Sequence, residues 1–141
     1  MIQRIQTLWL FLAGVGGLLT YKLPLWTCLL QDSTNKSFYG AENLLLFALI
    51  IVTSLLAFFI IFLFKNRSRQ KLLCFLGMVL SAGIISLEYV MVENYTNKHS
   101  LQDSSWQIGA ILPVLMLILF FLAYLGILKD EKMLKSLDKI R

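Results

Sequence analysis

Charge is scarce in this 141-residue sequence, with 15% charged residues against 58% hydrophobic residues. A soluble domain is nearer half apolar and a quarter charged, so this composition excludes an ordinary water-soluble domain. The 13 basic and 8 acidic residues also avoid four long apolar stretches, with Glu88 as the exception. A soluble bundle would need a polar face on each helix. The length allows one domain, and we expect its solvent to be lipid.

Reactive side chains are equally few. His99 is the sole histidine, which excludes paired-histidine haem ligation and leaves any metal site or serine–histidine hydrolase dependent on one loop residue. Cys28 and Cys74 are expected in opposite leaflets, beyond disulfide reach, and no C-x-x-C pair or glycine-rich phosphate loop occurs. We therefore expect no catalytic residue, no metal, no cofactor and no enzymatic activity.

The apolar stretches are each long enough to cross a bilayer as a helix. A helix rises about 1.5 Å per residue, and the hydrocarbon core is roughly 30 Å thick. Transmembrane strands are excluded because the apolar runs do not alternate with polar residues. The sequence predicts an all-α, four-helix membrane bundle in a single domain. We place the spans at 5–25, with an apolar core at 5–21, and at 44–64, 72–92 and 106–128, followed by a tail at 129–141.

The basic residues predict the orientation of the bundle. An even number of spans puts both termini on one side, and ten of the 13 basic residues fall on that side. Lys22, Lys36 and Lys98 fall on the other side. By the positive-inside rule both termini are cytoplasmic. Anionic headgroups on the cytoplasmic face then account for the excess of basic residues, and no nucleic-acid partner is expected.

The outer segments are predicted to be loops. Residues 27–30 are apolar enough to lie on the membrane surface, and 31–40 form a polar turn region. Ser104 precedes Gln107 by three residues, a capping-box spacing that would start the fourth helix just before Trp106. Pro113 removes one backbone hydrogen bond from that helix and predicts a modest kink.

The tail has an amphipathic pattern, with apolar residues on one stripe of a helix. We expect it to continue the fourth helix and then bend along the inner membrane surface as an anchor on anionic lipid; a docking face for a cytoplasmic protein partner is the alternative. The basic residues that would contact lipid or partner are Lys129, Lys132, Lys135, Lys139 and Arg141.

Glu88 is the one charge within the four apolar stretches, and an intramembrane carboxyl group is by default a functional hypothesis. Helical phasing places it on one face with Cys74, Gly77, Ser81 and Ile84. Glu88 is therefore expected to face other helices.

Two interpretations of Glu88 remain open. In the structural one, it snorkels outward, pairs with Lys22, or bonds to Tyr21 or Tyr89, and fixes the helix register. In the functional one, it is a protonatable gate or ion site of a small transporter or channel. Close helix packing is predicted at the small residues Ala13, Gly17, Gly77 and Ser81.

Both ends of the chain carry distinctive motifs. The opening MIQRIQTL, the inner loop beginning FLFKNR at residues 62–67, and the closing KDEK and SLDKIR segments resemble a bacterial domain-of-unknown-function family of small four-helix membrane proteins. The resemblance implies a four-span protein of the cytoplasmic membrane of a Gram-negative bacterium, and it brings no activity and no site residues. We accordingly expect a non-enzymatic accessory or scaffold subunit of a membrane assembly.

Overall fold

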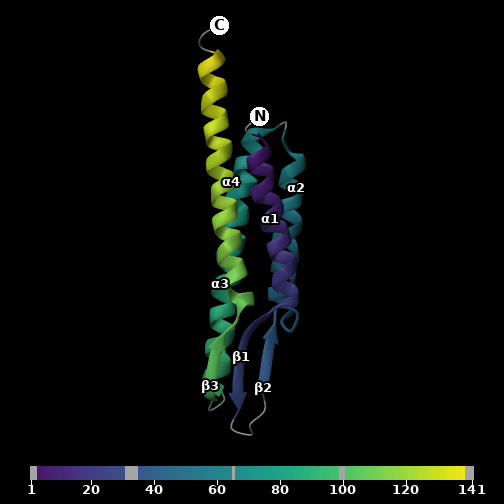
Figure 1. The fold of residues 1–141 in the computed structure, drawn as a ribbon, viewed down its shortest axis with the longest axis vertical. Helices are drawn as coiled ribbons and strands as arrows, with labels where there is room; N and C mark the ends of the chain where they lie inside the picture. Colours follow the sequence, from purple (N-terminus) through teal and green to yellow (C-terminus); the bar gives the residue numbers. More distant parts are fainter. Residues whose placement is uncertain (1–2, 31–34, 65, 99–100, 139–141) are drawn as a thin grey trace.

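The computed structural model describes residues 3–30, 35–64, 66–98 and 101–138, and it is mostly helical (Figure 1). The helical prediction is confirmed, but the all-α prediction is wrong because a three-stranded sheet is also present. The helices are α1 (Gln3–Lys22), α2 (Leu44–Phe62), α3 (Arg67–Lys98) and α4 (Ile108–Asp138), and the strands are β1 (Pro24–Leu30), β2 (Asn35–Tyr39) and β3 (Leu101–Trp106).

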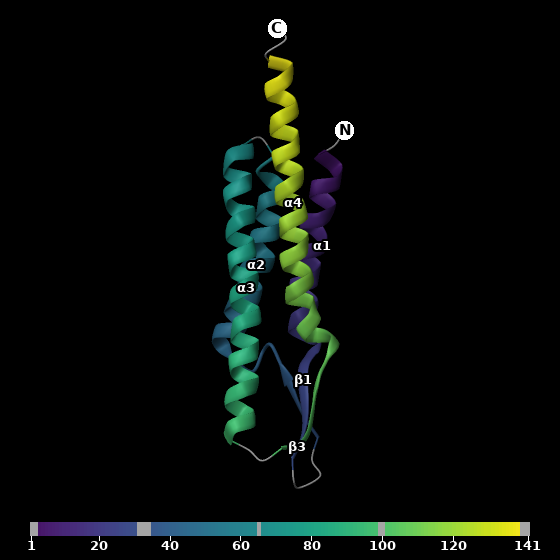
Figure 2. The same ribbon diagram turned by 90° about the vertical axis from the view of Figure 1, so that its left-hand side faces the viewer.

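The four helices run up and down in one elongated bundle. Helix α1 packs against α2 and α4, and α3 packs against α2 and α4, so each helix contacts the two that adjoin it in a ring. Figures 1 and 2 show that the start of α1 and the end of α4 lie at the same end of the bundle, whereas the sheet lies at the opposite end. We call these the terminal end and the sheet end.

Three of these helices are long and apolar enough to cross a membrane: Leu44–Phe62, Arg67–Lys98 and Ile108–Met133. This length and composition agree with a membrane protein. Helix α1 does not meet the same criterion within its described residues. It nevertheless lies beside α2 and α4, and it exposes large apolar side chains, among them Leu8, Phe11 and Leu18.

Local signals explain where the helices begin and end. Helix α2 starts after Asn43, whose side-chain oxygen accepts hydrogen bonds from the backbone N–H groups of Leu45 (2.9 Å) and Leu46 (3.3 Å). This cap satisfies two donors that lack partners within the helix. Helix α3 extends beyond the predicted span 72–92 at both ends. Its extra turns take in Arg67, Arg69 and Lys71 of the predicted inner loop and part of the predicted second outer loop.

The sheet forms from segments that we predicted to be loops. Strand β1 is central, and it pairs antiparallel with β2 on one side and with β3 on the other. Residues 27–30, which we predicted to be part of a loop, instead belong to β1, where Thr27 pairs with both Ser37 and Ser105. The predicted start of the fourth helix before Trp106 is also wrong, since Trp106 ends β3 and α4 begins at Ile108.

Close contacts join the sheet to the bundle. The backbone N–H of Gln107 donates to the carbonyl oxygen of Leu25 at 3.1 Å, and its side chain donates to the Thr27 hydroxyl at 2.9 Å. At Gly109 an added Cβ would lie 2.8 Å from the carbonyl carbon of Pro24. Only glycine allows the first turn of α4 to approach the start of β1 so closely, because the neighbour is backbone.

Small residues lie at the helix contacts of the main core. An added Cβ at Gly77 would lie 2.6–2.8 Å from the Phe120 ring, and one at Gly17 would overlap the Ser54 hydroxyl. Ala13 and Ser81 are fully buried. The core cluster around them includes Leu10, Ala57, Ile60, Cys74, Met116, Phe120, Ala123 and Ile127.

The tail differs from its prediction in direction. Helix α4 is continuous from Ile108 through Pro113 to Asp138. Figures 1 and 2 show that it continues along the bundle axis and projects past the other helices, without bending aside. The expected bend along the membrane surface is therefore wrong for the described part of the tail. The stretch beyond residue 138 lies outside the described residues.

Candidate functional site

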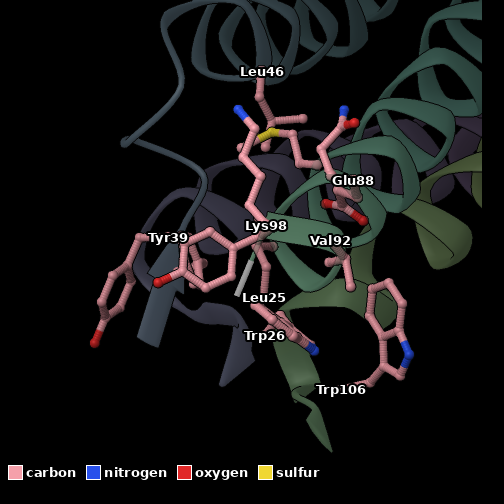
Figure 3. Close-up of a pocket in the computed structure, with 12 residues that line it drawn as sticks. Leu25, Trp26, Tyr39, Leu46, Glu88, Val92, Lys98 and Trp106 are labelled. Atoms are coloured by element: carbon pink, nitrogen blue, oxygen red, sulfur yellow. The ribbon is translucent and has the colours of Figure 1, made fainter. Parts of the chain in front are cut away.

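A pocket of about 220 Å³ lies between the sheet and the last turns of α3 (Figure 3). Strands β1 and β2 contribute Leu25, Trp26 and Tyr39 to its wall, helix α2 contributes Leu46, and Trp106 contributes from the end of β3. The wall is thus largely apolar and aromatic. We call this space the sheet-end pocket.

Aromatic rings from strands β1 and β2 and from helix α3 pack together at one side of the pocket. The ring centroids of Phe38 and Tyr95 are 4.6 Å apart, those of Trp26 and Phe38 are 5.3 Å apart, and those of Trp26 and Tyr95 are 5.8 Å apart. Edge-on and tilted contacts of this kind are favourable for aromatic pairs. The three rings therefore fix β1 and β2 against α3, and this packing forms the pocket.

A lysine ammonium group already lies over this ring cluster. The Nζ atom of Lys36 is 5.1 Å from the Phe38 centroid and 5.4 Å from the Tyr95 centroid. Both distances fall within the range of cation–π attraction. The rings thus present a face that attracts a cation.

Glu88 lies in the wall of the pocket, and its carboxyl group points into the space (Figure 3). The residue is 5% exposed, and its Oε1 atom has no hydrogen-bond partner among the described residues. Lys98 also lines the pocket, about 15 Å further along α3 at 1.5 Å per residue. Within the described chain, no ion pair joins Lys98 to Glu88.

The partners that we predicted for Glu88 lie elsewhere. Lys22 and Tyr21 are exposed at the end of α1, where the Tyr21 ring contacts Phe47 with centroids 5.6 Å apart. Tyr89 is 61% exposed. Among the described residues, Glu88 forms no hydrogen bond or ion pair with any of them. Glu88 is buried on the face of α3 that helical phasing indicates, but its carboxyl group points into the sheet-end pocket and not towards another helix.

The nearby Cys28 thiol is buried in β1. Burial raises the pKa of the Cys28 thiol, and the charge of Lys36 offsets part of that rise. A raised pKa keeps the group as an unreactive thiol near neutral pH. Cys74, the other cysteine, is buried in α3 near the terminal end, and neither cysteine forms a disulfide.

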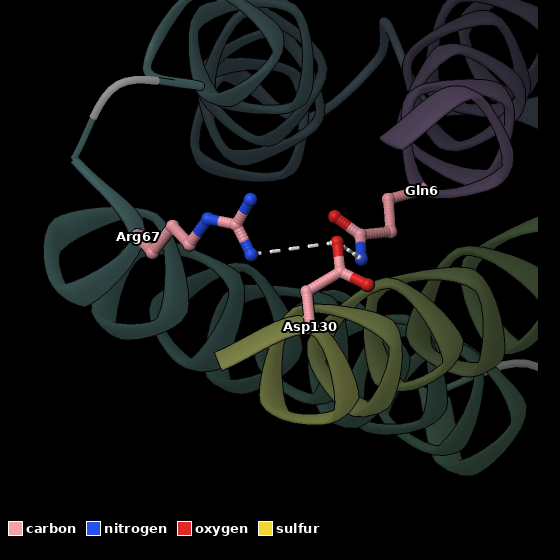
Figure 4. Close-up of polar contacts among 3 residues, drawn as sticks. All are labelled: Gln6, Arg67 and Asp130. Carbon is pink, nitrogen blue, oxygen red and sulfur yellow. Dashed lines mark hydrogen bonds and ion pairs between the residues drawn. The ribbon is translucent and has the colours of Figure 1, made fainter. Parts of the chain in front are cut away.

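A polar cluster lies at the opposite end of the bundle (Figure 4). The Gln6 amide nitrogen donates to Asp130 Oδ2 at 2.7 Å, and an Arg67 guanidinium nitrogen lies 3.7 Å from the same oxygen. An ion pair between Lys71 and Glu131 lies beside it. Helices α1, α3 and α4 are thereby joined at the terminal end. Gln6 and Asp130 belong to the MIQRIQTL and KDEK segments at the two ends of the chain, but no sequence pattern singles out either residue.

The basic residues of the tail are described only in part. Lys129 and Lys132 are exposed on α4. The backbone of Lys135 lies in α4, but its side chain lies outside the described residues, as do Lys139 and Arg141 altogether.

The family of the chain follows from its sequence as a whole. A family model described as Domain of unknown function (DUF4293) matches residues 2–140. The chain belongs to this family. Membership in DUF4293 confirms the resemblance drawn from the two ends of the sequence and assigns no activity. A search of curated proteins and a search of solved structures each find no match to this chain.

The pattern of charges in this DUF4293 chain points to Glu88 but not to the pocket around it. Trp26 and Phe38 meet through the pairing of β1 with β2, and Tyr95 joins them from α3. The signal in the sequence is the alternation of apolar Trp26 and Cys28 with polar Thr27, which is typical of a strand with one covered face.

Proposed function

We propose that this chain is a non-enzymatic accessory subunit of a bacterial cytoplasmic-membrane assembly, with four spans and both termini in the cytoplasm. The observation that carries the proposal is the course of α4, which projects beyond the bundle along its axis (Figure 2). A lipid anchor would lie in the membrane plane. A helix that leaves the bundle along its axis instead presents its sides to a protein.

The fourth span is argued from packing. Helix α1 lies beside α2 and α4, and its exposed side chains include Leu8, Phe11 and Leu18. If α2 and α4 cross the hydrocarbon layer, α1 shares their depth, and only lipid or a partner helix would cover these side chains without cost. We therefore include α1 among the spans.

The orientation is argued from the charges at the two ends. The terminal end carries Arg67, Arg69 and Lys71 at the start of α3 and Lys129 and Lys132 on α4. Of the predicted outer lysines, all three belong to segments at the sheet end. The positive-inside rule puts the terminal end in the cytoplasm. A fluorescent-protein fusion to the C-terminus should fluoresce in intact cells, and an alkaline-phosphatase fusion there should be inactive.

The partner is tested by site-specific photocrosslinking. Met133, exposed on the projecting part of α4, is replaced by a photoreactive phenylalanine analogue, and the exposed Val79 on α3 serves as the lipid-facing control. The protein is then purified in mild detergent. We expect one stoichiometric protein to crosslink from position 133 and not from 79. A lone monomer, or a crosslink only to a second copy, would contradict the accessory role.

A small transporter or channel that uses Glu88 is the second candidate, favoured by the burial of that carboxyl group. The interior polar groups do not extend this site into a path. The hydroxyls of Thr53, Ser54 and Ser81 donate to carbonyl oxygens of their own helices at 2.7–2.8 Å, which satisfies them locally. If Glu88→Gln leaves proton- or ion-driven flux in loaded liposomes unchanged, transport through Glu88 is abandoned.

A further inference from the structure

We propose that the sheet-end pocket binds a small amine that carries an apolar or aromatic group, with the amine's ammonium ion paired to Glu88. This goes beyond the accessory role and does not depend on it. The inference rests on the cavity, on an unpartnered buried carboxyl group that points into it, and on an aromatic wall beside that group.

The carboxyl group defines the polar end of the ligand. Burying an ionisable carboxyl group without a partner costs several kcal/mol, which an opposite charge or hydrogen-bond donors would offset. Glu88 Oε1 has no such partner within the described chain, although the residue faces about 220 Å³ of space. An ammonium group supplies both a positive charge and N–H donors, which a carboxylate accepts.

The wall defines the rest of the ligand. Trp26, Tyr95 and Met91 line the pocket, with Leu25 and Leu46 closer to the bundle. These side chains favour an apolar or aromatic group, and the aromatic faces also attract a cation. Drug-sized ligands occupy pockets of roughly 300–1,000 Å³, so 220 Å³ favours a smaller molecule with one ring or a short chain.

The lysines at the pocket affect approach more than binding. Lys36 and Lys98 are exposed, so their repulsion of a cation is screened by salt and water. Glu88 is 5% exposed and is screened far less. The deepest charged group in the pocket therefore determines which sign of charge is bound.

The same ammonium chemistry has two sources, a free amine and the headgroup of phosphatidylethanolamine. Glu88 lies on the side of the pocket nearer the bundle, and Lys98 lies towards the end of α3. A free amine entering from the sheet end would lead with its ammonium group and reach Glu88. We therefore take the free amine as the ligand, and the experiment includes an arm for the lipid.

The test compares phenethylamine with 2-phenylethanol, which has the same apolar group and a hydroxyl in place of the ammonium group. Binding to the full chain in maltoside detergent is measured by calorimetry at one salt concentration. We expect phenethylamine to bind at least tenfold more tightly than 2-phenylethanol. Equal affinities, or no saturable binding of phenethylamine, would overturn the proposal, and neither result depends on a variant that folds.

Two matched variants then locate the charge that matters. Glu88→Gln should remove the tenfold preference for the amine, because it keeps the size of the side chain and loses the charge. Glu93→Gln, at an exposed position five residues along the same helix, should retain the tenfold preference for the amine. If the Glu88→Gln variant still prefers phenethylamine over 2-phenylethanol, the ammonium group must bind elsewhere, and its pairing with Glu88 is refuted.

The lipid arm separates the two sources. Micelles are doped with phosphatidylethanolamine or, as the control, with phosphatidylglycerol, which has no amine. Unchanged phenethylamine affinity in both supports the free amine. A loss of affinity with phosphatidylethanolamine alone supports the ammonium site and identifies the lipid headgroup as its occupant.

Discussion

Replacement of Gly77 by alanine tests a close contact between α3 and the Phe120 ring of α4. The added Cβ would lie 2.6–2.8 Å from three atoms of the Phe120 ring, whereas ordinary contact begins at 3.4 Å. The ring would have to move by about 0.8 Å. Phe120 is fully buried in the main core, so its movement displaces neighbouring side chains. Overpacking of this kind costs about 1–3 kcal/mol.

Gly83→Ala is the matched control. It lies in the interior of the same helix, and an added Cβ there meets nothing within 4 Å. Alanine gains about 1 kcal/mol of helix propensity over glycine at both positions, so this gain cancels in the comparison. Gly77→Ala should therefore be less stable than Gly83→Ala by about 1–3 kcal/mol, which corresponds to a change of roughly 5- to 160-fold in the unfolding equilibrium.

The measurement is equilibrium unfolding by SDS in mixed micelles, followed by helical circular dichroism. Adding Phe120→Leu to Gly77→Ala should recover part of the loss, because the smaller side chain leaves room for the new methyl group. A double-mutant cycle isolates this coupling from the separate cost of the Phe120 truncation. If Gly77→Ala is as stable as Gly83→Ala, or if the cycle shows no coupling, the packing of α3 on α4 through Gly77 is refuted.

Three further predictions address the two ends of the bundle. Gly109→Ala should lower the unfolding temperature and disrupt the sheet, because the new methyl group would press on the Pro24 backbone; an unchanged melting curve would contradict this. Asp130→Ala should destabilise the protein by about 1–3 kcal/mol and Asp130→Asn by less, because alanine leaves the buried Gln6 amide without its acceptor; SDS unfolding ranks the two. Since burial raises the pKa of the Cys28 thiol, maleimide labelling at pH 7.5 should be at least tenfold slower in the native protein than in the unfolded protein, as measured by peptide mass spectrometry, and equal rates would refute its burial.

The helices were predictable because few backbone conformations are stable inside a membrane. A long apolar run without alternation must satisfy its backbone hydrogen bonds internally, which only a helix does. The buried face of α3 followed from helical phasing alone, and the structure buries Cys74, Gly77, Ser81, Ile84 and Glu88. The ends of α3 were not predictable from hydropathy, since its polar first and last turns are helical for reasons of packing and local bonding.

The sheet was not predictable from the same reasoning. Strand β3, with the sequence LQDSSW, has no apolar alternation, and it becomes a strand because Trp106 and Ser105 pair with Trp26 and Thr27 of β1. That pairing requires the end of α1 and the start of α4 to be adjacent, which is a property of the assembled bundle. The strands form part of the pocket wall, so the pocket could not be predicted from the sequence without the strand pairing.

The two buried carboxyl groups make the strongest contrast in the molecule. Asp130, at the terminal end, is 6% exposed, and Gln6 and Arg67 contact its Oδ2 atom. Its Oδ1 atom has no partner among the described residues, and the adjacent space is about 20 Å³, room for about one water molecule. Glu88, at the sheet end, is equally buried, but within the described chain no side chain donates to it, and it faces a space of about 220 Å³. A protein that stabilised both groups internally would need no cavity at Glu88. The cavity and the missing donor occur together, and that coincidence is why the sheet-end pocket is the place to look for a ligand.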